Sequence, residues 1–298
     1  MPTKIFKKIF PGWNGGTYIN RNSVNVPPLL LNLFPGASAA YSFRKLDTTY
    51  AGSAVQVRRV SDNATQDIGF TNNLLNTAAL ASFLGSSAGA ISIWYDQSGN
   101  GKNLINTTTT QQPVLYAGSS GVYSNNGVPY CKFDGVDDIL FSAVGFDPTS
   151  AGVISTFAVG IADMSTVTTT VLLHQDSGPG QRVGQWARFT GGASQSITFN
   201  TVNAISLSNG TSVTSGAPYV YTTLRAATSI ESYVNGNSNG PVTTTGTAAS
   251  NAAAPIYVGA RNPGEYLKGL MSEVILYPAD KTSTRAAIEQ NIRNYFSF

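Results

Sequence analysis

The sequence predicts an all-β fold, a jelly-roll sandwich with few helices. Short alternating apolar runs such as residues 55–60 and 128–133 recur along the chain, and Thr, Ser, Asn and Gly separate them. This is the pattern of strands joined by turns. Asn235-Gly236 follows one such run and supplies the positive φ angles of a tight hairpin. Helical spacing is confined to two segments, 77–84 and 284–295, so strands dominate the prediction.

Composition excludes several classes of protein. Charged residues make up 11% of the 298 residues, far below the usual ~25%. The net charge of +3 is too small for a nucleic-acid partner. The sequence contains no apolar run of 18 residues, so no membrane span is expected. The first ten residues are basic and apolar but lack the features of a signal peptide.

The single cysteine, Cys131, allows no intrachain disulfide and is predicted to be a small buried residue of a strand. Large secreted eukaryotic domains usually carry disulfides, so a bacterial or viral source is favoured.

Residues 1–38 are predicted to lie outside the sandwich, which we expect to span residues 39–298. Proline and glycine recur in this segment, yet its apolar content is high for a solvated tail. One interpretation is a strand and loop that pack on their own domain. The other is an extended arm that anchors the chain to a partner through apolar side chains, namely Phe6, Phe10, Trp13, Leu30 and Phe34.

The chain after the arm is expected to contain many strands and two helices. Residues 55–60 alternate as a strand, and residues 77–84 form a short helix with Asn76 or Thr77 as N-cap. Residues 90–95 form a strand that ends in a tight polar loop, 96–103. Further strands are expected at 130–141, 152–161, 167–173, 183–189, 196–200 and 219–225. In the last helix, Ile288, Ile292 and Tyr295 form one apolar stripe that packs on the sandwich.

Two groups of motifs carry a resemblance to a known family. Ala40-Tyr-Ser, Val55-Gln-Val-Arg-Arg and Trp94-Tyr-Asp-Gln-Ser-Gly-Asn-Gly101 resemble the catalytic-type domain of α-L-arabinofuranosidase B. The closing strands and helix, with Phe133-Asp-Gly, resemble the concanavalin A-like lectin/glucanase sandwich on which that family is built. Similar modules occur in phage virion surface proteins, where they need not be enzymes.

The resemblance implies two catalytic carboxylates, and the sequence departs from the family at both. The family's nucleophile is a Glu in the middle of the domain, but residues 150–230 contain no Glu and only Asp163 and Asp176 as acids. The family's acid/base is an Asp in a Gly-Gly-Asp-Asn motif, whereas this chain reads Gly259-Ala-Arg-Asn262. Arg261 cannot donate a proton near neutral pH. The family's adjacent cysteines are also missing. We therefore expect that the chain is not an enzyme.

Candidate binding residues are few. The strongest cluster for a glycan or partner is a loop that contains Arg261, Asn262, Glu265 and Tyr266, with Trp186 as a further stacking face. Asp96 and Asn100 either contact sugar or bond their own loop as Asx turns. Asp134, Asp137 and Asp138 form an acidic turn that could contribute to a calcium site. Turn formation is the simpler interpretation, and no cofactor or metal is expected.

The expected function is a non-catalytic phage virion protein on the virion surface: a head fibre, decoration or tail component with a lectin-like domain for adhesion to cell-surface glycans. The arm would bind capsid or tail proteins. A homo-oligomer is expected, and a trimer is considered because many phage fibres are trimers. The alternatives are a secreted, extracellular carbohydrate-binding module and an active arabinofuranosidase-like glycoside hydrolase with relocated carboxylates.

Overall fold

The computed structural model confirms the all-β jelly-roll sandwich. It describes residues 28–143, 153–165, 169–176, 182–190, 193–201, 205–226, 229–243, 255–261 and 264–298. Within these residues, none of the helices is long and apolar enough to cross a membrane.

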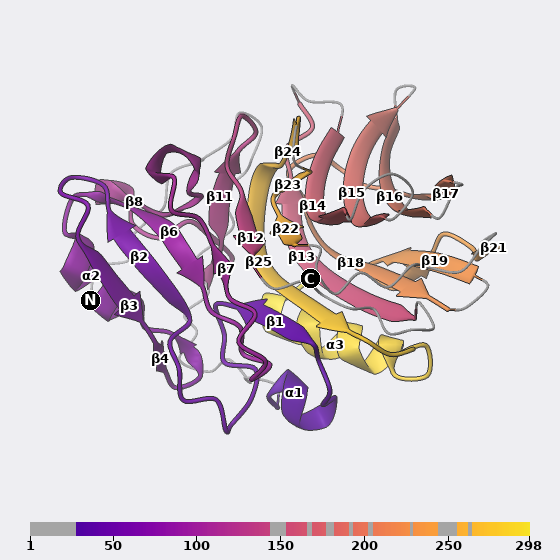
Figure 1. Ribbon diagram of the computed structural model, residues 1–298, viewed down its shortest axis with the longest axis horizontal. Helices are drawn as coiled ribbons and strands as arrows, with labels where there is room; N and C mark the ends of the chain where they lie inside the picture. Colours follow the sequence, from indigo (N-terminus) through magenta and orange to yellow (C-terminus); the bar gives the residue numbers. More distant parts are fainter. Residues whose placement is uncertain are drawn as a thin grey trace.

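The first layer of the sandwich is a row of antiparallel strands (Figure 1). In spatial order they are β3 (Thr65–Ile68), β2 (Val55–Arg59), β6 (Ala88–Trp94), β7 (Leu104–Ile105), β12 (Leu140–Ser142), β22 (Ile256–Val258), β14 (Thr169–Asp176), β15 (Arg182–Thr190), β16 (Ala193–Thr201) and β17 (Ile205–Ser212).

The second layer is built around the long strand β25 (Lys268–Tyr277). One edge of β25 pairs with β11 (Cys131–Asp134) and then with β1 (Ala39–Ser42), and its other edge pairs with β13 (Ile154–Ala162). Next to β13 come β18 (Pro218–Arg225), β19 (Ser229–Val234), β20 (Asn237–Ser238) and β21 (Val242–Thr243). Strand β8 (Val114–Ala117) pairs with both β6 and β11 and so joins the two layers.

Short elements complete the described fold. Three two-stranded pairs are β4 (Phe70–Thr71) with β5 (Leu74–Leu75), β9 (Ser124–Asn125) with β10 (Val128–Pro129), and β23 (Ala260–Arg261) with β24 (Glu265–Tyr266). The helices are α1 (Leu30–Leu33), α2 (Thr77–Leu84) and α3 (Arg285–Phe296), with 3-10 turns at Thr109–Gln111 and Gly118–Ser120.

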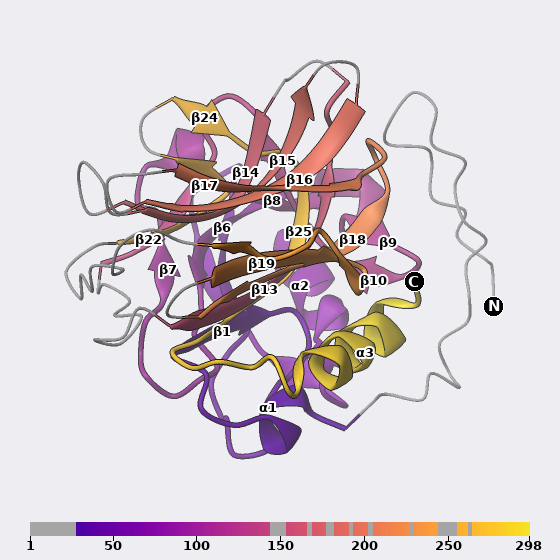
Figure 2. The same ribbon diagram turned by 90° about the vertical axis from the view of Figure 1, so that its right-hand side faces the viewer.

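Two hydrophobic clusters hold these layers together. One lies between the layers and includes Trp94, which stacks on Phe43 with ring centroids 4.8 Å apart. The other lies on the far side of β25 and β13, where α3 and α1 cover the sheet (Figure 2). Ile288 and Ile292 are fully buried there. Because both faces of β25 are covered, almost every residue of that strand is buried.

The segment before β1 differs from the expected arm. Leu30 is fully buried in the chain's own second cluster, and Phe34 packs against the same cluster. The Tyr277 hydroxyl donates to the Phe34 carbonyl at 2.8 Å. Residues 28–38 therefore pack on this chain, which corrects the assignment of Leu30 and Phe34 to a partner surface. Phe6, Phe10 and Trp13 lie outside the described residues.

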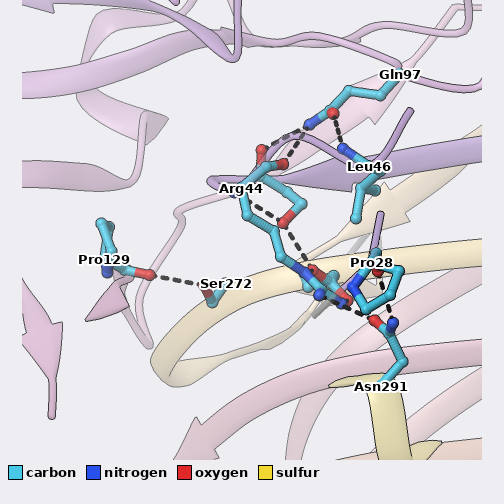
Figure 3. Close-up of polar contacts among 9 residues, drawn as sticks. Pro28, Arg44, Leu46, Gln97, Pro129, Ser272 and Asn291 are labelled. Carbon is cyan, nitrogen blue, oxygen red and sulfur yellow. Dashed lines mark hydrogen bonds and ion pairs between the residues drawn. The ribbon is translucent and has the colours of Figure 1, made fainter. Parts of the chain in front are cut away.

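A polar network around a buried ion pair links this segment to β25 and the last helix (Figure 3). The Arg44 guanidinium donates to the Glu273 carboxylate at 2.7 and 2.9 Å and to the Asn291 side-chain oxygen at 3.0 Å. The Asn291 amide in turn donates to the Pro28 carbonyl at 2.8 Å. β1, β25, α3 and the residues before α1 thus share one polar network inside the second cluster.

Candidate functional site

Three segments that are distant in sequence meet where β25 begins, at Lys268. The acidic turn after β11 lies on one side, because Asp134 and Lys268 are register partners. The end of β13 lies on the other, where the Asp163 amide donates to the Lys268 carbonyl at 2.7 Å. The β23–β24 hairpin precedes Lys268 in the chain and lies beside β14 (Figure 1). We call this place the Lys268 edge.

The acidic turn is ordered by its own carboxylates. Asp134 Oδ1 accepts the Val136 amide at 2.7 Å, and Asp138 Oδ2 accepts the Asp134 amide at 2.9 Å. Asp138 is 5% exposed, whereas Asp134 is exposed. Burial, followed by repulsion from Asp134, raises the pKa of Asp138 to about 7. A carboxyl in this state holds a proton over much of the acid range and can donate it.

Asp163 has the opposite electrostatic character. Burial raises the pKa of Asp163, but hydrogen bonds from the Ser165 hydroxyl and amide, together with Lys268, outweigh burial and leave that pKa below its ordinary value. The Lys268 ammonium lies 3.4 Å from Asp163 Oδ2, and the Ser165 amide is 3.0 Å from Asp163 Oδ1. Asp163 is therefore a preorganised, ionised carboxylate.

The hairpin carries the residues that sequence analysis favoured. Arg261 and Glu265 are register partners and form an ion pair of 3.3 Å across it, and Tyr266 follows on β24. Asn262 lies outside the described residues. Gly259, at the entry to the hairpin, has φ +84°, and a Cβ there would overlap the Phe133 ring. Phe133 precedes Asp134, so this contact fixes the hairpin against the acidic turn.

The other predicted site residues are not brought to this edge. Asp96 is buried and accepts from the Ala40 amide at 2.9 Å and the Lys102 amide at 3.0 Å. Asn100 donates to the Ala37 carbonyl at 3.1 Å. Both fasten their loop to β1, which pairs with the far end of β25. Asp96 also forms an Asx turn, since its Oδ1 accepts the Ser98 amide at 2.9 Å, whereas the Asn100 side chain bonds to the segment before β1 and to the Ser98 hydroxyl. Trp186 lies on β15, but its side chain is outside the described residues.

The acidic turn is also the place to test for a metal. One carboxylate oxygen each from Asp134, Asp137 and Asp138 lie within 4.8 Å of one another. Calcium requires six to eight oxygen ligands, and burial raises the pKa of Asp138 to about 7, so without a bound cation this carboxyl is only partly ionised near neutral pH. The existing hydrogen bonds already explain the turn. The expectation of no metal remains a prediction.

Sequence analysis missed Lys268 as the centre of the site. Lys268 is 105 positions from Asp163 and 134 from Asp134, and each neighbour was interpreted separately. The sequence feature that could have indicated this contact is the motif Phe133-Asp-Gly135. A Cβ at Gly135 would lie 2.7 Å from Lys268 Cβ, so that glycine permits the close approach of the turn to β25.

Comparisons with known proteins agree with the resemblance seen in the sequence. The family model for the catalytic domain of α-L-arabinofuranosidase B matches residues 34–127. The model for the concanavalin A-like lectin/glucanases superfamily matches residues 161–287. A probable α-L-arabinofuranosidase B from Aspergillus fumigatus is 38% identical over 120 residues, which are 40% of this chain and 20% of that protein.

Solved structures show the same fold. A GH54 α-L-arabinofuranosidase soaked with a cyclic sulfate inhibitor has a TM-score of 0.68 at 15% identity, over 91% of this chain and 65% of that one. An arabinofuranosidase complexed with arabinofuranosyl-α-1,2-xylobiose has a TM-score of 0.64 at 16% identity, with the same coverage. The chain thus spans 65% of the solved enzymes and only one fifth of the curated relative.

These comparisons contradict two expectations from the sequence. The expected non-catalytic phage virion protein is wrong, because the matched relatives are arabinofuranosidases. The expectation that the chain is not an enzyme is contradicted by the same relatives. That expectation assumed that catalytic carboxylates stay at the family's positions. The Lys268 edge shows other carboxyl groups gathered beside the hairpin that carries Arg261.

Proposed function

We propose that this chain is an arabinofuranosidase-like glycoside hydrolase that acts at the Lys268 edge. The observation that carries the proposal is a pair of aspartates on either side of Lys268 whose pKa values are displaced in opposite directions. The pKa of Asp138 is raised to about 7 by burial and by Asp134. Hydrogen bonds and Lys268 hold the pKa of Asp163 below its usual value against the effect of burial. Opposed environments of this kind separate the acid from the base in glycosidases.

Each aspartate has a distinct role. Cleavage of a glycosidic bond develops positive charge on the sugar ring and negative charge on the departing oxygen. The ionised Asp163 carboxylate stabilises the positive ring, either by direct attack or by activating a water molecule. Asp138 gives its proton to the departing oxygen. Hydrogen bonds from Ser165, with a smaller contribution from Lys268, keep Asp163 ionised. We assign Tyr266 and the Arg261–Glu265 pair to the sugar site, because their hairpin precedes Lys268 directly in the chain.

The experiment measures turnover of 4-nitrophenyl α-L-arabinofuranoside and of an arabinofuranosyl oligosaccharide by wild-type protein and three variants. Asp163→Asn should lose about 100-fold or more on both substrates, because its charge is needed in either case. Asp138→Asn should lose activity mainly on the oligosaccharide, since nitrophenolate departs without a proton. Asp280→Asn, at an exposed aspartate after β25, is the matched control and should be unchanged.

Two results would contradict the proposal. Wild-type protein that turns over neither substrate, while its unfolding transition is cooperative, would show that this edge is not catalytic. Activity that survives in Asp163→Asn would place the reaction on other carboxylates.

A further inference from the structure

The loop that follows β7, residues 106–112, turns two amide side chains inward and four threonines outward. Asn106 and Gln112 are 2% and 5% exposed, whereas residues 107–110 are all exposed. Buried side-chain amides have hydrogen-bond partners in almost every folded protein. The partners of these two amides therefore show which part of the fold the loop is fastened to.

The Asn106 side chain binds the residue that follows Asp138. Its amide donates to the Ile139 carbonyl at 2.8 Å and to the Gln111 carbonyl at 3.0 Å. Its oxygen accepts the Thr108 amide at 2.8 Å. The Ile139 amide in turn donates to the Gln111 carbonyl at 3.0 Å. Both backbone groups of Ile139 are therefore held by this one loop, although Asn106 lies 33 positions earlier in the chain.

These bonds replace strand pairing where β7 and β12 separate. Ile105 is the last residue of β7 and is the register partner of Phe141. A longer β7 would offer its own backbone groups to the residues just before Phe141. The Asn106 side chain and the Gln111 carbonyl take that place. The backbone at the start of β12, directly after Asp138, is thus positioned by a side chain and a loop rather than by the sheet.

The loop is itself fixed from behind by a buried cation. The Gln112 amide donates to the Asn106 carbonyl at 2.6 Å, and Arg58 Nε donates to the Gln112 side-chain oxygen at 2.7 Å. The two terminal nitrogens of Arg58 donate to Asn63 Oδ1 at 2.9 Å and to the Thr109 carbonyl at 2.8 Å. This chain of bonds runs from β2 through the loop to Ile139. Support of this kind holds the groups of a site within a fraction of an ångström.

The carboxyl group of Asp138 depends on the closed form of its turn. Asp138 is 5% exposed, and its Oδ2 accepts the Asp134 amide at 2.9 Å. The titratable groups that interact with it in the described part of the chain lie on the turn and on β11: Asp134, Asp137, Lys132 and Cys131. Residues 106–112 carry no charge. The loop therefore acts on Asp138 through position and exclusion of water, and not through a charge of its own.

We propose that Asn106 is the positioning residue of the acid at the Lys268 edge, and that it keeps the Asp138 carboxyl buried by holding the Ile139 backbone. The part of Asn106 in turnover rests on the proposed function, whereas its effect on Asp138 does not. Without the Asn106 amide, the Ile139 carbonyl loses a buried donor and the start of β12 moves toward water. The Asp138 carboxyl is then hydrated and ionises more readily.

The first test follows the titration of Asp138 by carbon-13 NMR of the aspartate carboxyl groups in the full chain, with Asp138→Asn to assign the signal. Asn106→Ala should lower the midpoint of this titration by about one pH unit or more, because water reaches a carboxyl whose ionisation burial had opposed. Asn106→Ser keeps a shorter donor and should lower the midpoint less. Asn76→Ala is the matched control, since it also removes a side-chain bond to a backbone group, at the start of α2. It should leave the midpoint unchanged.

Turnover separates positioning from a merely structural role. On the arabinofuranosyl oligosaccharide, Asn106→Ala should lower kcat about tenfold with little change in KM, since a small displacement of the acid slows proton transfer. The alkaline limb of kcat should move by the same amount as the Asp138 titration. On 4-nitrophenyl α-L-arabinofuranoside, whose leaving group departs without a proton, kcat should be nearly unchanged. A general loss of folded protein would instead reduce turnover of both substrates alike.

The outcomes separate this inference from the proposed function. An Asp138 midpoint that stays at the wild-type value in both Asn106 variants would overturn the inference, whether or not the protein is active. A lowered midpoint in a protein that turns over neither substrate would support the role of Asn106 and overturn the hydrolase.

The reverse combination would leave the hydrolase and overturn the positioning role. It would appear as an alkaline limb that is lost in Asp138→Asn but does not move in the Asn106 variants. If Asn106→Ala lacks a cooperative unfolding transition, the midpoint of Asn106→Ser decides by the same criterion.

Discussion

At the scale of single residues, the behaviour of the site depends on what surrounds each carboxyl group rather than on residue type. Asp138 and Asp163 are chemically identical, yet burial beside Asp134 raises the pKa of one to about 7. Hydrogen bonds and Lys268 outweigh burial at the other. Sequence analysis identified Asp163 as a remaining acid and Asp138 as a turn residue. It could not predict their opposed pKa values, because these arise from contacts between distant segments.

The first residue-scale prediction concerns pH. If Asp138 is the proton donor, kcat on the arabinofuranosyl oligosaccharide should fall as pH rises through about 7, where Asp138 loses its proton. The acid limb should lie below the usual aspartate range, because the pKa of Asp163 is lowered. The Asp138→Asn variant should lose the alkaline limb. A profile that is flat from pH 6 to 8 would contradict the assignment.

Asp138 should also make the stability of the fold depend on pH. The folded pKa of Asp138, about 7, lies above the ordinary aspartate value, so the folded state binds more protons than the unfolded state between about pH 4 and 7. This group therefore destabilises the fold progressively as pH rises through that window. Denaturant midpoints of wild type and Asp138→Asn should diverge in favour of the variant as pH rises from about 4 to 7. If the midpoints of the two proteins changed with pH by the same amount, folding would not raise the pKa of Asp138.

The buried ion pair gives another residue-scale prediction. Arg44 and Glu273 are 2% and 1% exposed, so removal of one partner leaves a buried charge. Arg44→Met should lower the free energy of unfolding by about 3–5 kcal/mol. Arg44→Met combined with Glu273→Leu should recover part of that loss, as measured by urea denaturation. Equal losses in the single and double variants would mean that the packing of Arg44 on Tyr295, and not its charge, is what matters.

At the scale of elements, local sequence patterns correctly predicted those helices and turns whose conformation depends mainly on their own residues. Helix α2 spans the predicted residues, and the Asn76 side chain caps it by accepting the Ala79 amide at 3.0 Å. The Asn235-Gly236 turn has φ values of 48° and 85°, as the hairpin requires. By alternation Arg58 lies on the face of β2 opposite Val55 and Val57, yet it is only 7% exposed, and its guanidinium donates to the Gln112 side-chain oxygen at 2.7 Å. Alternation predicts the face of a side chain but not what covers that face.

Docking of the C-terminal helix is the element-scale prediction. The predicted apolar stripe of α3, which comprises Ile288, Ile292 and Tyr295, is buried, and Ile292 is fully inaccessible to solvent. Ile292→Ala should cost about 2–4 kcal/mol of unfolding free energy through lost burial and the cavity that remains. Gln290→Ala, on the exposed side of the same helix, is the control and should change stability little. A cost for Ile292→Ala no greater than that of the control would mean that α3 does not hold the second cluster together.

At the scale of the whole molecule, the fold was predictable and the assembly of its parts was not. Strands 219–225 and 152–161 were expected from their patterns, and they pair in the structure as β18 and β13. The resemblance also predicted the sandwich. Nothing local indicated that Lys268, Asp134 and Asp163 meet. Strand β25 brings them together, because Asp134 pairs with Lys268 in register and the Asp163 amide donates to the Lys268 carbonyl just beyond the end of β13.

At this scale we predict that the folded core begins near residue 28 and not at residue 39. The structure ties residues 28–38 to the core through Leu30, through the bond from Asn291 to the Pro28 carbonyl, and through the bond from Tyr277 to the Phe34 carbonyl. Deletion of residues 1–27 should leave the unfolding midpoint close to that of the full chain. Deletion of residues 1–38 should lower the midpoint substantially, because it uncovers the second cluster and leaves the Asn291 amide without its Pro28 partner. Equal midpoints for the two truncated chains would restore residue 38 as the boundary and show that the segment around α1 contributes little to the core it covers.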